Sequence, residues 1–268
     1  MPGRVPDDEQ ARVFDHGDFD AAALAGARSG RTVSVCIPAR DEAATIGPIV
    51  RSIVAALTVA GGGVDLVDEV VVVDDGSTDG TGDIAERAGA RVVRGDAPAG
   101  GKGQAMRVAL REAHGDIIAF VDGDVTNFGP HFVTGLLGPL LTDDATTLVK
   151  GFYRRPLNGA PDGGGRVTEL MARPVIDLLF PALAVIRQPL AGETAAHRWV
   201  FEKCVPADGY AVELALLIDA DSHFGVDTVA QVDLGVRVHR NRPLSELRPQ
   251  ATDILAAALA RSPLHPED

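Results

Sequence analysis

A chain of 268 residues, of which 46% are hydrophobic, is long enough to bury a full core as one large α/β domain or as two small ones. Its formal net charge of −13 excludes the basic surface that binds nucleic acids or anionic membranes. Cys36 and Cys204 stand far apart, which indicates neither a disulfide framework nor a zinc site, and no apolar run reaches membrane-spanning length. We therefore expect a cytoplasmic protein with no nucleic-acid partner and no membrane partner.

The first 30 residues are charged and lack the apolar segment of a signal peptide, so we expect a poorly ordered arm with at most a short helix near Phe19 to Ala27. The β-branched run from Thr32 to Ile37 predicts the first strand, which Pro38 should end. Apolar residues at helical spacing from Ile46 to Leu57 predict the next helix, with Thr45 as its cap. A strand followed by a helix is the first half of the unit from which parallel sheets are built.

The same alternation continues to about residue 150 and predicts an α/β fold with a mostly parallel sheet. Further strands are expected at 69–73, 90–93, 117–121 and 147–153, and helices at 84–88, 105–113 and 132–141. Beyond residue 150 the pattern changes, with an apolar helical stretch at 170–183 that two prolines interrupt, a buried helix at 210–218, a strand at 231–239 and a helix at 254–260. We therefore divide the chain into an arm (1–30), a first region (31–150) and a second region (151–268).

The strand expected at 117–121 carries no charge and ends directly in Asp122-Gly123-Asp124. In an open α/β sheet, ligands bind beyond the carboxyl ends of the strands, so both carboxylates should face a ligand. Two carboxylates one residue apart suit Mg²⁺ or Mn²⁺ held on a diphosphate. The alternative is an ordinary polar turn, because Asp and Gly are common turn residues. A second acidic loop, from Asp74 to Asp79, follows the strand at 69–73 and marks the same edge.

Lys102 stands among glycines at the start of the helix expected at 105–113, in a chain that has few lysines. Glycines and one lysine at a helix N-terminus can bind phosphate through backbone N–H groups. The alternative is a glycine-rich turn with an exposed lysine. The spacing matches neither a Walker A motif nor a dinucleotide-binding fingerprint, so both of these nucleotide sites are excluded.

The second region contains two further candidates. Gly165-Arg166-Val167-Thr168 either binds an anion with backbone, guanidinium and hydroxyl groups, or places Thr168 as a helix cap with Arg166 in solvent. Glu213 lies in the buried helix expected at 210–218, where a glutamate is either partnered or functional.

Together these motifs resemble the nucleotide-sugar glycosyltransferases of the GT-A fold, which have a Rossmann-like, mostly parallel sheet and a smaller C-terminal acceptor region. The matching segments are 38–42, 74–79, 101–103 and 122–124, each in the context the family requires. The chain is more closely similar to the retaining glucosyl-3-phosphoglycerate synthases of actinobacteria. That similarity is carried by segments 152–157, 165–170, 209–213 and 239–243.

The resemblance implies transfer of glucose from UDP-glucose to the 2-hydroxyl of 3-phosphoglycerate, with Mg²⁺ or Mn²⁺, by a homodimer. It implies that the donor is bound by Pro38, Ala39, Asp41, Glu42, Asp75, Lys102, Asp122 and Glu213. It implies that the acceptor is bound by Gly165, Arg166, Thr168, Asn241 and Arg242, and the metal by Asp124 and His239. The catalytic residues would be Glu213, Asp124 and Lys102.

Three other functions are compatible with parts of this pattern. A mannosyl-3-phosphoglycerate synthase shares these motifs and differs in using GDP-mannose as its donor. A sugar-1-phosphate nucleotidyltransferase has a similar sheet but a glycine-rich loop with a basic residue after the first strand, and Pro38 to Glu42 form no such loop. A non-catalytic sugar-nucleotide-binding module would bind the donor without turnover.

Overall fold

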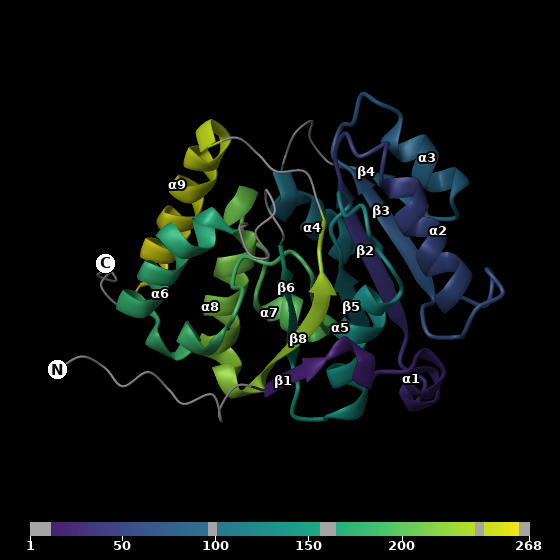
Figure 1. Ribbon diagram of the computed structural model, residues 1–268, viewed down its shortest axis with the longest axis horizontal. Helices are drawn as coiled ribbons and strands as arrows, with labels where there is room; N and C mark the ends of the chain where they lie inside the picture. The colour runs from purple at the N-terminus through teal and green to yellow at the C-terminus, as the bar shows by residue number, and fades with distance from the viewer. Residues whose placement is uncertain (1–11, 96–100, 156–164, 239–243, 263–268) are drawn as a thin grey trace.

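The computed structural model describes residues 12–95, 101–155, 165–238 and 244–262, the side chains of 244–246 excepted. These residues build one eight-stranded sheet in the order β1-β8-β6-β7-β5-β2-β3-β4 (Figure 1). Strand β7 is antiparallel to both of its neighbours, and every other adjacent pair is parallel. The mostly parallel α/β sheet expected from the sequence is therefore confirmed. The strands are β1 (Arg12–Asp15), β2 (Val33–Ala39), β3 (Glu69–Asp74), β4 (Arg91–Arg94), β5 (Ile117–Phe120), β6 (Leu148–Arg154), β7 (Thr194–His197) and β8 (Val229–Val236).

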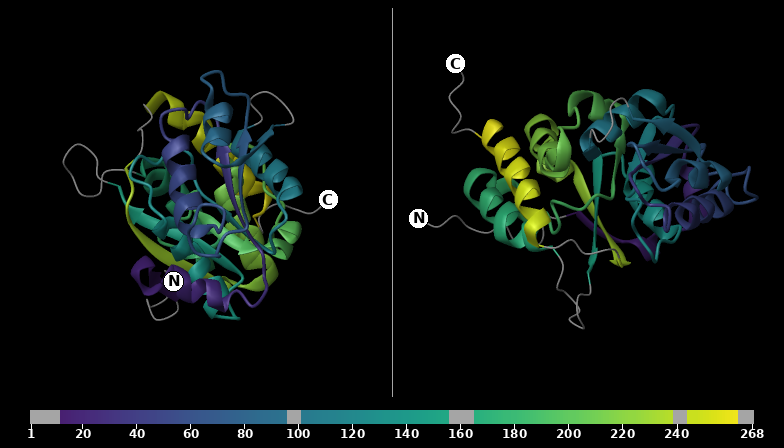
Figure 2. Two further views of the ribbon diagram at one scale, coloured as in Figure 1. Left: turned by 90° about the vertical axis from the view of Figure 1, so that its right-hand side faces the viewer. Right: turned by 90° about the horizontal axis from the view of Figure 1, so that it is seen from above.

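Helices cover both faces of the sheet and make a three-layer sandwich. One face packs against α1 (Ala21–Ala27), α2 (Ile46–Leu57), α3 (Thr81–Arg87) and α5 (His131–Thr142). The other packs against α4 (Gly101–Glu112), α6 (Arg173–Leu179), α7 (Arg198–Lys203), α8 (Val212–Phe224) and α9 (Leu244–Ala260). Figure 2 shows that α8 and α9 lie at the end of the molecule opposite to α2 and α3. Within the described ranges, no helix is long and apolar enough to cross a membrane.

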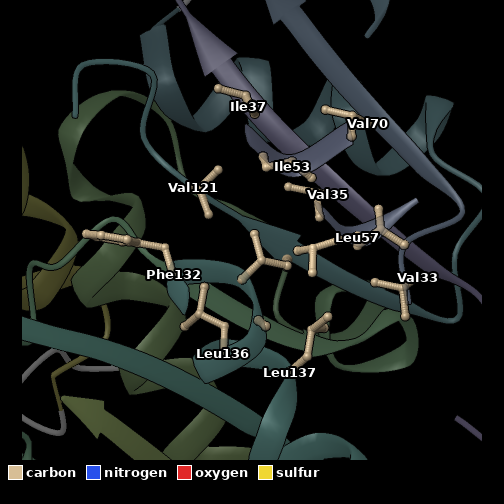
Figure 3. Close-up of a cluster of buried hydrophobic side chains, with 14 of the residues drawn as sticks. Val33, Val35, Ile37, Ile53, Leu57, Val70, Val121, Phe132, Leu136 and Leu137 are labelled. Atoms are coloured by element: carbon tan, nitrogen blue, oxygen red, sulfur yellow. The ribbon is translucent and has the colours of Figure 1, made fainter. Parts of the chain in front are cut away.

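The core on the first face forms where alternate residues of β2 meet two helices. Val33, Val35 and Ile37 point to this face and are fully buried (Figure 3). They pack with apolar residues of α2 and α5 that recur at helical spacing, among them Ile53 and Leu136. Since β2 is buried on both faces, it reads in the sequence as a continuous apolar run.

The parallel register brings three loops to one edge of the sheet. Residues of β2 pair in parallel with β3 on one side and with β5 on the other, so the carboxyl ends of all three strands lie at one edge, with β5 ending three residues before β2. The backbone N–H of Asp75 donates to the carbonyl of Ala39 at 2.9 Å, and that of Val121 to the carbonyl of Cys36 at 3.2 Å. The loops that follow, 40–45, 75–80 and 121–125, therefore lie at one carboxyl edge, as the sequence predicted.

The expectation of a poorly ordered arm is wrong for the part of it that the structure describes. Residues Arg12–Asp15 form β1, which extends the sheet by pairing in parallel with β8. Helix α1 follows, and Asp20 caps its N-terminus by accepting hydrogen bonds from the N–H groups of Ala22 and Ala23. The short helix expected near Phe19 to Ala27 is therefore confirmed.

Of two local predictions around β2, one is wrong and the other is confirmed in part. Pro38 lies inside β2 instead of ending it. The backbone polar groups of Cys36 point toward β5, so those of Pro38, two residues further along, point to the same side, where β5 has already ended at Phe120 and no N–H is needed. Thr45 occupies the N-cap position of α2 as expected, but its side chain makes no capping hydrogen bond, and its hydroxyl donates to the carbonyl of Gly123 at 2.6 Å.

The chain between β6 and α8 forms shorter helical segments than the sequence predicted. A π-helical turn (Thr168–Ala172) leads into α6, which has Pro174 in its first turn, and a 3₁₀ turn (Pro181–Val185) follows. The antiparallel strand β7 and helix α7 were not predicted, because the small residues of β7 carry no strand pattern. The sheet also crosses the boundary that we placed at residue 150, so both regions contribute strands to it.

Candidate active site

A cavity of about 530 Å³ opens at the carboxyl edge of β2, β3 and β5. Its wall includes every described residue that the family resemblance assigned to donor, acceptor or metal. These are Pro38, Ala39, Asp41, Glu42, Asp75, Lys102, Asp122, Asp124, Gly165, Arg166, Thr168 and Glu213. The remaining three, His239, Asn241 and Arg242, lie outside the described residues. The structure thus brings twelve residues from six segments of the chain to one cavity, while their individual roles remain predictions.

Lys102 lies between two carboxylates at the bottom of the cavity. Its Nζ donates to Asp122 Oδ1 at 2.5 Å and lies 2.8 Å from Glu213 Oε1. Burial favours the neutral amine, but the charges of Asp122 and Glu213 outweigh burial and raise the pKa of Lys102. The exposed-lysine alternative is therefore excluded. Glu213, in the first turn of α8, is a partnered glutamate, which leaves its functional role open.

Arg237, which the sequence analysis missed, provides the second cation of this cluster. Its Nη2 donates to Asp122 Oδ2 at 2.8 Å and to Asp124 Oδ1 at 2.6 Å. Burial acts to raise the pKa of Asp122, but the neighbouring Lys102 and Arg237 outweigh it, so that the pKa lies below its usual range. Arg237 follows β8 in a stretch of alternating polar and apolar residues, where the sequence gives an inward-pointing arginine no distinguishing signal.

Behind Arg237 lies a layer of buried polar side chains that the sequence also did not reveal. The Tyr153 hydroxyl accepts from Arg237 Nη1 at 2.5 Å and from Arg155 Nη2 at 2.9 Å. Glu193 is fully buried, and burial raises its pKa. Lys150 donates to the carbonyl of Ala191 at 2.5 Å, and burial lowers its pKa to about 8. Of these groups, Tyr153 bonds Arg237 directly, and Glu193 lies 3.6 Å from it.

The two acidic loops hold each other at the rim of the cavity. Asp41, at a φ of 54°, accepts through Oδ1 from the N–H of Thr78 at 2.8 Å, and its own N–H donates to Ser77 Oγ at 3.0 Å. Asp75 accepts through Oδ2 from the N–H of Gly101 at 3.0 Å. These bonds connect the segments after β2 and β3 to the start of α4, which makes the rim one preorganised surface.

The glycines beside Lys102 allow close packing against a neighbouring loop. A Cβ on Gly103 would overlap the carbonyl of Ala207, and Gly101 has a φ of +81° and lies against Gly209. The N–H of Gly101 is used by Asp75. These glycines therefore bring the helix start close to the 207–209 segment, and Lys102 is the charged side chain that this start places in the cavity wall.

The segment Gly165 to Thr168 also lines the cavity. Thr168 is buried in the first position of the π-helical turn, and no side chain caps this turn. The alternative in which Thr168 serves as a helix cap is therefore wrong. Arg166 is exposed and lines the cavity, as an anion-binding guanidinium would require.

The carboxylates of Asp122 and Asp124 fit a divalent cation that also binds a substrate diphosphate. Mg²⁺ is commonly held by one or two carboxylates, with phosphate and water oxygens completing its coordination. No cluster of three or more His, Cys, Asp or Glu ligands occurs within the described ranges, so the carboxylates that these ranges could supply to a metal are Asp122 and Asp124. Both oxygens of Asp122 and one oxygen of Asp124 are bonded to Lys102 or Arg237, and a metal would have to share or replace these contacts.

Comparison with known proteins identifies the family. The model of "Glycosyl transferase family 2" matches residues 34–185, which include the loops after β2, β3 and β5. The chain belongs to this family. It is therefore a glycosyltransferase, and the family expected from the motifs is confirmed.

Individual relatives are similar in sequence to this chain along nearly its whole length. Glucosyl-3-phosphoglycerate synthase of Mycolicibacterium smegmatis is 50% identical over 92% of this chain and 83% of its own length. The Mycobacterium tuberculosis enzyme of that name is 43% identical over 97% of this chain and 82% of its own. A crystal structure of the latter with Mn²⁺, UDP-glucose and phosphoglyceric acid has a TM-score of 0.80 at 45% identity, over 91% of this chain and 84% of that one. A structure of it with Mg²⁺ and UDP has a TM-score of 0.85 at 42% identity, over 96% and 88% of the two chains.

Proposed function

We propose that this glycosyltransferase transfers glucose from UDP-glucose to the 2-hydroxyl of 3-phosphoglycerate with retention of configuration, and that it requires Mg²⁺ or Mn²⁺. The observation that carries the proposal is the cavity itself, whose wall includes Lys102, Asp122 and Asp124 together with Arg166. Cations and metal-binding carboxylates suit a sugar diphosphate, and a separate guanidinium suits a second anion. The relatives that bind UDP-glucose and phosphoglyceric acid support this choice of substrates.

The donor would lie along the first region, between the rim loops and the start of α4. Cleavage of the bond between the sugar and the diphosphate leaves negative charge on the β-phosphate. Lys102 is positioned to stabilise this charge, because Asp122 and Glu213 keep it protonated and in place. When bound by Asp124 and the proposed ligand His239, a divalent cation would act there as a Lewis acid.

The acceptor would lie against the second region. Its phosphate and carboxylate groups need a cationic pocket on a protein of net charge −13. Arg166 provides a guanidinium at the cavity wall, beside Gly165 and the buried Thr168. We propose that Asn241 and Arg242 complete this acceptor site.

Retention requires the acceptor hydroxyl to attack from the face that the diphosphate leaves. Glu213 is paired with Lys102, so we do not assign it as a nucleophile and propose that it binds sugar hydroxyls. In the proposed step, the bond from the sugar carbon to the phosphate oxygen breaks, and a bond to the acceptor oxygen forms. The acceptor's hydroxyl proton passes to the departing phosphate oxygen, so that no protein base is needed.

We further propose that the enzyme works in the cytoplasm as a homodimer. Both cysteines are free and buried, which suits a reducing compartment. Leu170, Leu178 and Leu259 are exposed apolar side chains on or near α6 and α9, which provides apolar surface for a second copy. Light scattering of the purified chain tests the dimer.

A crossed assay tests the function. The purified chain is incubated with UDP-glucose or GDP-mannose, each with 3-phosphoglycerate or glycerate, and with and without Mg²⁺. We expect UDP release and product only with UDP-glucose, 3-phosphoglycerate and metal together. Transfer from GDP-mannose alone would identify a mannosyl-3-phosphoglycerate synthase. Donor binding without any transfer would identify a binding module.

A further inference from the structure

Arg237 lies beside the Asp122–Asp124 pair, where a divalent cation would also bind. Its side chain is 5% exposed, and a single nitrogen, Nη2, donates to one oxygen of each aspartate. A guanidinium that bridges both carboxylates neutralises the charge to which a metal ion would be drawn. Before a metal binds, Arg237 is therefore its competitor.

The opposite side of this guanidinium faces another acid. Arg237 Nη1 lies 3.6 Å from Glu193 Oε2, beyond the roughly 2.7–3.2 Å of an N–H···O hydrogen bond. Glu193 is 0% exposed, and neither of its carboxylate oxygens has a hydrogen-bond partner of ordinary geometry among the described residues, although the nearby Tyr153 hydroxyl acts to lower its pKa. Arg237 Nε is buried without a hydrogen-bond partner as well. A buried carboxylate without hydrogen bonds is costly, so its presence beside Arg237 needs a reason.

The backbones of both residues are fixed to the same strand, which leaves only side-chain torsions to change. The N–H of Arg237 donates to the carbonyl of Arg154 at 3.0 Å, and the N–H of Gly151 donates to the carbonyl of Glu193 at 2.9 Å. Tyr153, between them on β6, stacks its ring 5.2 Å from the Arg237 guanidinium. A shift of the guanidinium from Asp124 toward Glu193 would need no backbone movement, only side-chain torsions and a change in the hydrogen bond from Nη1 to the Tyr153 hydroxyl.

We propose that Arg237 is the counter-ion of the Asp122–Asp124 pair before a metal binds, and that Glu193 is the positioning residue that receives its guanidinium when a divalent cation takes Asp124. The inference rests on the proposed function in placing the cation at Asp124. A divalent ion repels the guanidinium, and Glu193 offers it hydrogen bonds that it does not make in the metal-free protein. Glu193 would then favour metal binding although it touches neither metal nor substrate.

Mn²⁺ binding to the full-length chain tests this exchange without any turnover. The signal of free Mn²⁺ in electron paramagnetic resonance is titrated with protein, first with the metal alone and then with saturating UDP. Removing the competitor in Arg237→Gln should strengthen binding of Mn²⁺ alone by about tenfold. Removing the receiving carboxylate in Glu193→Gln should weaken it by about fivefold. When Arg237→Gln is already present, adding Glu193→Gln should not change the Mn²⁺ affinity further, since Glu193 acts through Arg237.

A matched pair outside the cavity controls for charge alone. Asp219 on α8 accepts from Arg261 Nε at 2.7 Å, and neither residue lines the cavity. Asp219→Asn and Arg261→Gln repeat the two charge changes and should leave Mn²⁺ affinity unchanged.

Two outcomes overturn the proposal. One is a Mn²⁺ affinity that does not rise in Arg237→Gln, and the other is an equal effect of Glu193→Gln with and without Arg237. If Arg237→Gln does not fold, because it leaves Glu193 buried and unpaired, the double variant is compared with Glu193→Gln and must bind Mn²⁺ more tightly. The Mn²⁺ titration does not measure glucose transfer. A chain that shows this binding pattern but transfers no glucose would refute the proposed function and leave the exchange standing.

Discussion

Gly192 packs directly against the carboxylate of Asp122. A Cβ at this position would overlap both carboxylate oxygens and the Nζ of Lys102. Lys102 and Asp122 are paired and partly buried, so neither can move away without breaking the pair. The segment before β7, which carries no recognisable motif, is therefore part of the wall that holds the Lys102–Asp122 pair in place.

Gly192→Ala should displace the Lys102–Asp122 pair and reduce glucose transfer. Misplacement of a catalytic group by about 1 Å can cost on the order of 100-fold in rate. We expect kcat/KM for UDP-glucose to fall by about that factor. Gly62→Ala provides a control in a surface turn, where a Cβ would meet nothing and only the backbone is strained. Unchanged kinetics in Gly192→Ala would mean that the pair tolerates movement.

Lys102→Gln removes the cation proposed to stabilise the departing diphosphate. It also leaves Asp122 and Glu213 without the ammonium between them. Loss of one preorganised donor to a developing oxyanion costs about 100- to 1,000-fold in kcat, which is the expected effect. Steady-state kinetics with both substrates measures it. The control is Lys203→Gln, an exposed lysine of α7, which should retain full activity.

Arg166→Ala should weaken binding of the acceptor much more than binding of the donor. Its guanidinium lines the cavity, at the site that we propose for the acceptor. Loss of a charge-assisted contact of this kind costs on the order of 2 to 4 kcal/mol. We therefore expect the KM for 3-phosphoglycerate to rise and the KM for UDP-glucose to stay nearly constant. The exposed Arg87 on α3 provides the control substitution. An equal rise in both KM values would place Arg166 outside the acceptor site.

The sequence predicted the parts of the fold and site that depend on local pattern. Continuous apolar runs give β2, β3 and β5, and Asp122 and Asp124 follow because parallel strands end at one edge. Strand β1 was missed because it pairs with β8, 218 residues further along the chain, and four residues of mixed polarity carry no signal of their own.

The residues beneath the cavity were missed for a related reason. The roles of Arg237 and Glu193 depend on their proximity to each other and to Asp124. No spacing in the sequence connects these positions. Helical and strand periodicity report which face of an element a residue occupies, not which distant side chain it meets. Such contacts had to come from the three-dimensional structure.

Glu69 should support stability at neutral pH and lose this effect in acid. Burial acts to raise its pKa, but hydrogen bonds from Ser34, Arg91 and the N–H of His114 outweigh burial and lower the pKa to about 2, from a usual 4.5. A lowered folded-state pKa stabilises the fold above pH 4.5, and this contribution disappears as the pH falls from 4.5 to about 2. The lowering corresponds to an upper limit on the order of 3 kcal/mol.

Chemical denaturation of Glu69→Gln at several pH values measures this contribution. The variant should be less stable than the parent at pH 7, and the difference should shrink steadily below pH 4.5. Glu86→Gln, on the exposed side of α3, should match the parent at every pH. A difference for Glu69→Gln that is independent of pH would show that the carboxylate charge does not carry the effect.

The most direct test of the proposed function is the anomeric configuration of the product. UDP-glucose labelled with ¹³C at the anomeric carbon is incubated with 3-phosphoglycerate, Mg²⁺ and the purified chain, and the product is examined by NMR. Attack from the face that the diphosphate leaves predicts an α-linked glucosyl group on the 2-hydroxyl of 3-phosphoglycerate. A β-linked product, or a product on another hydroxyl, would contradict the proposal.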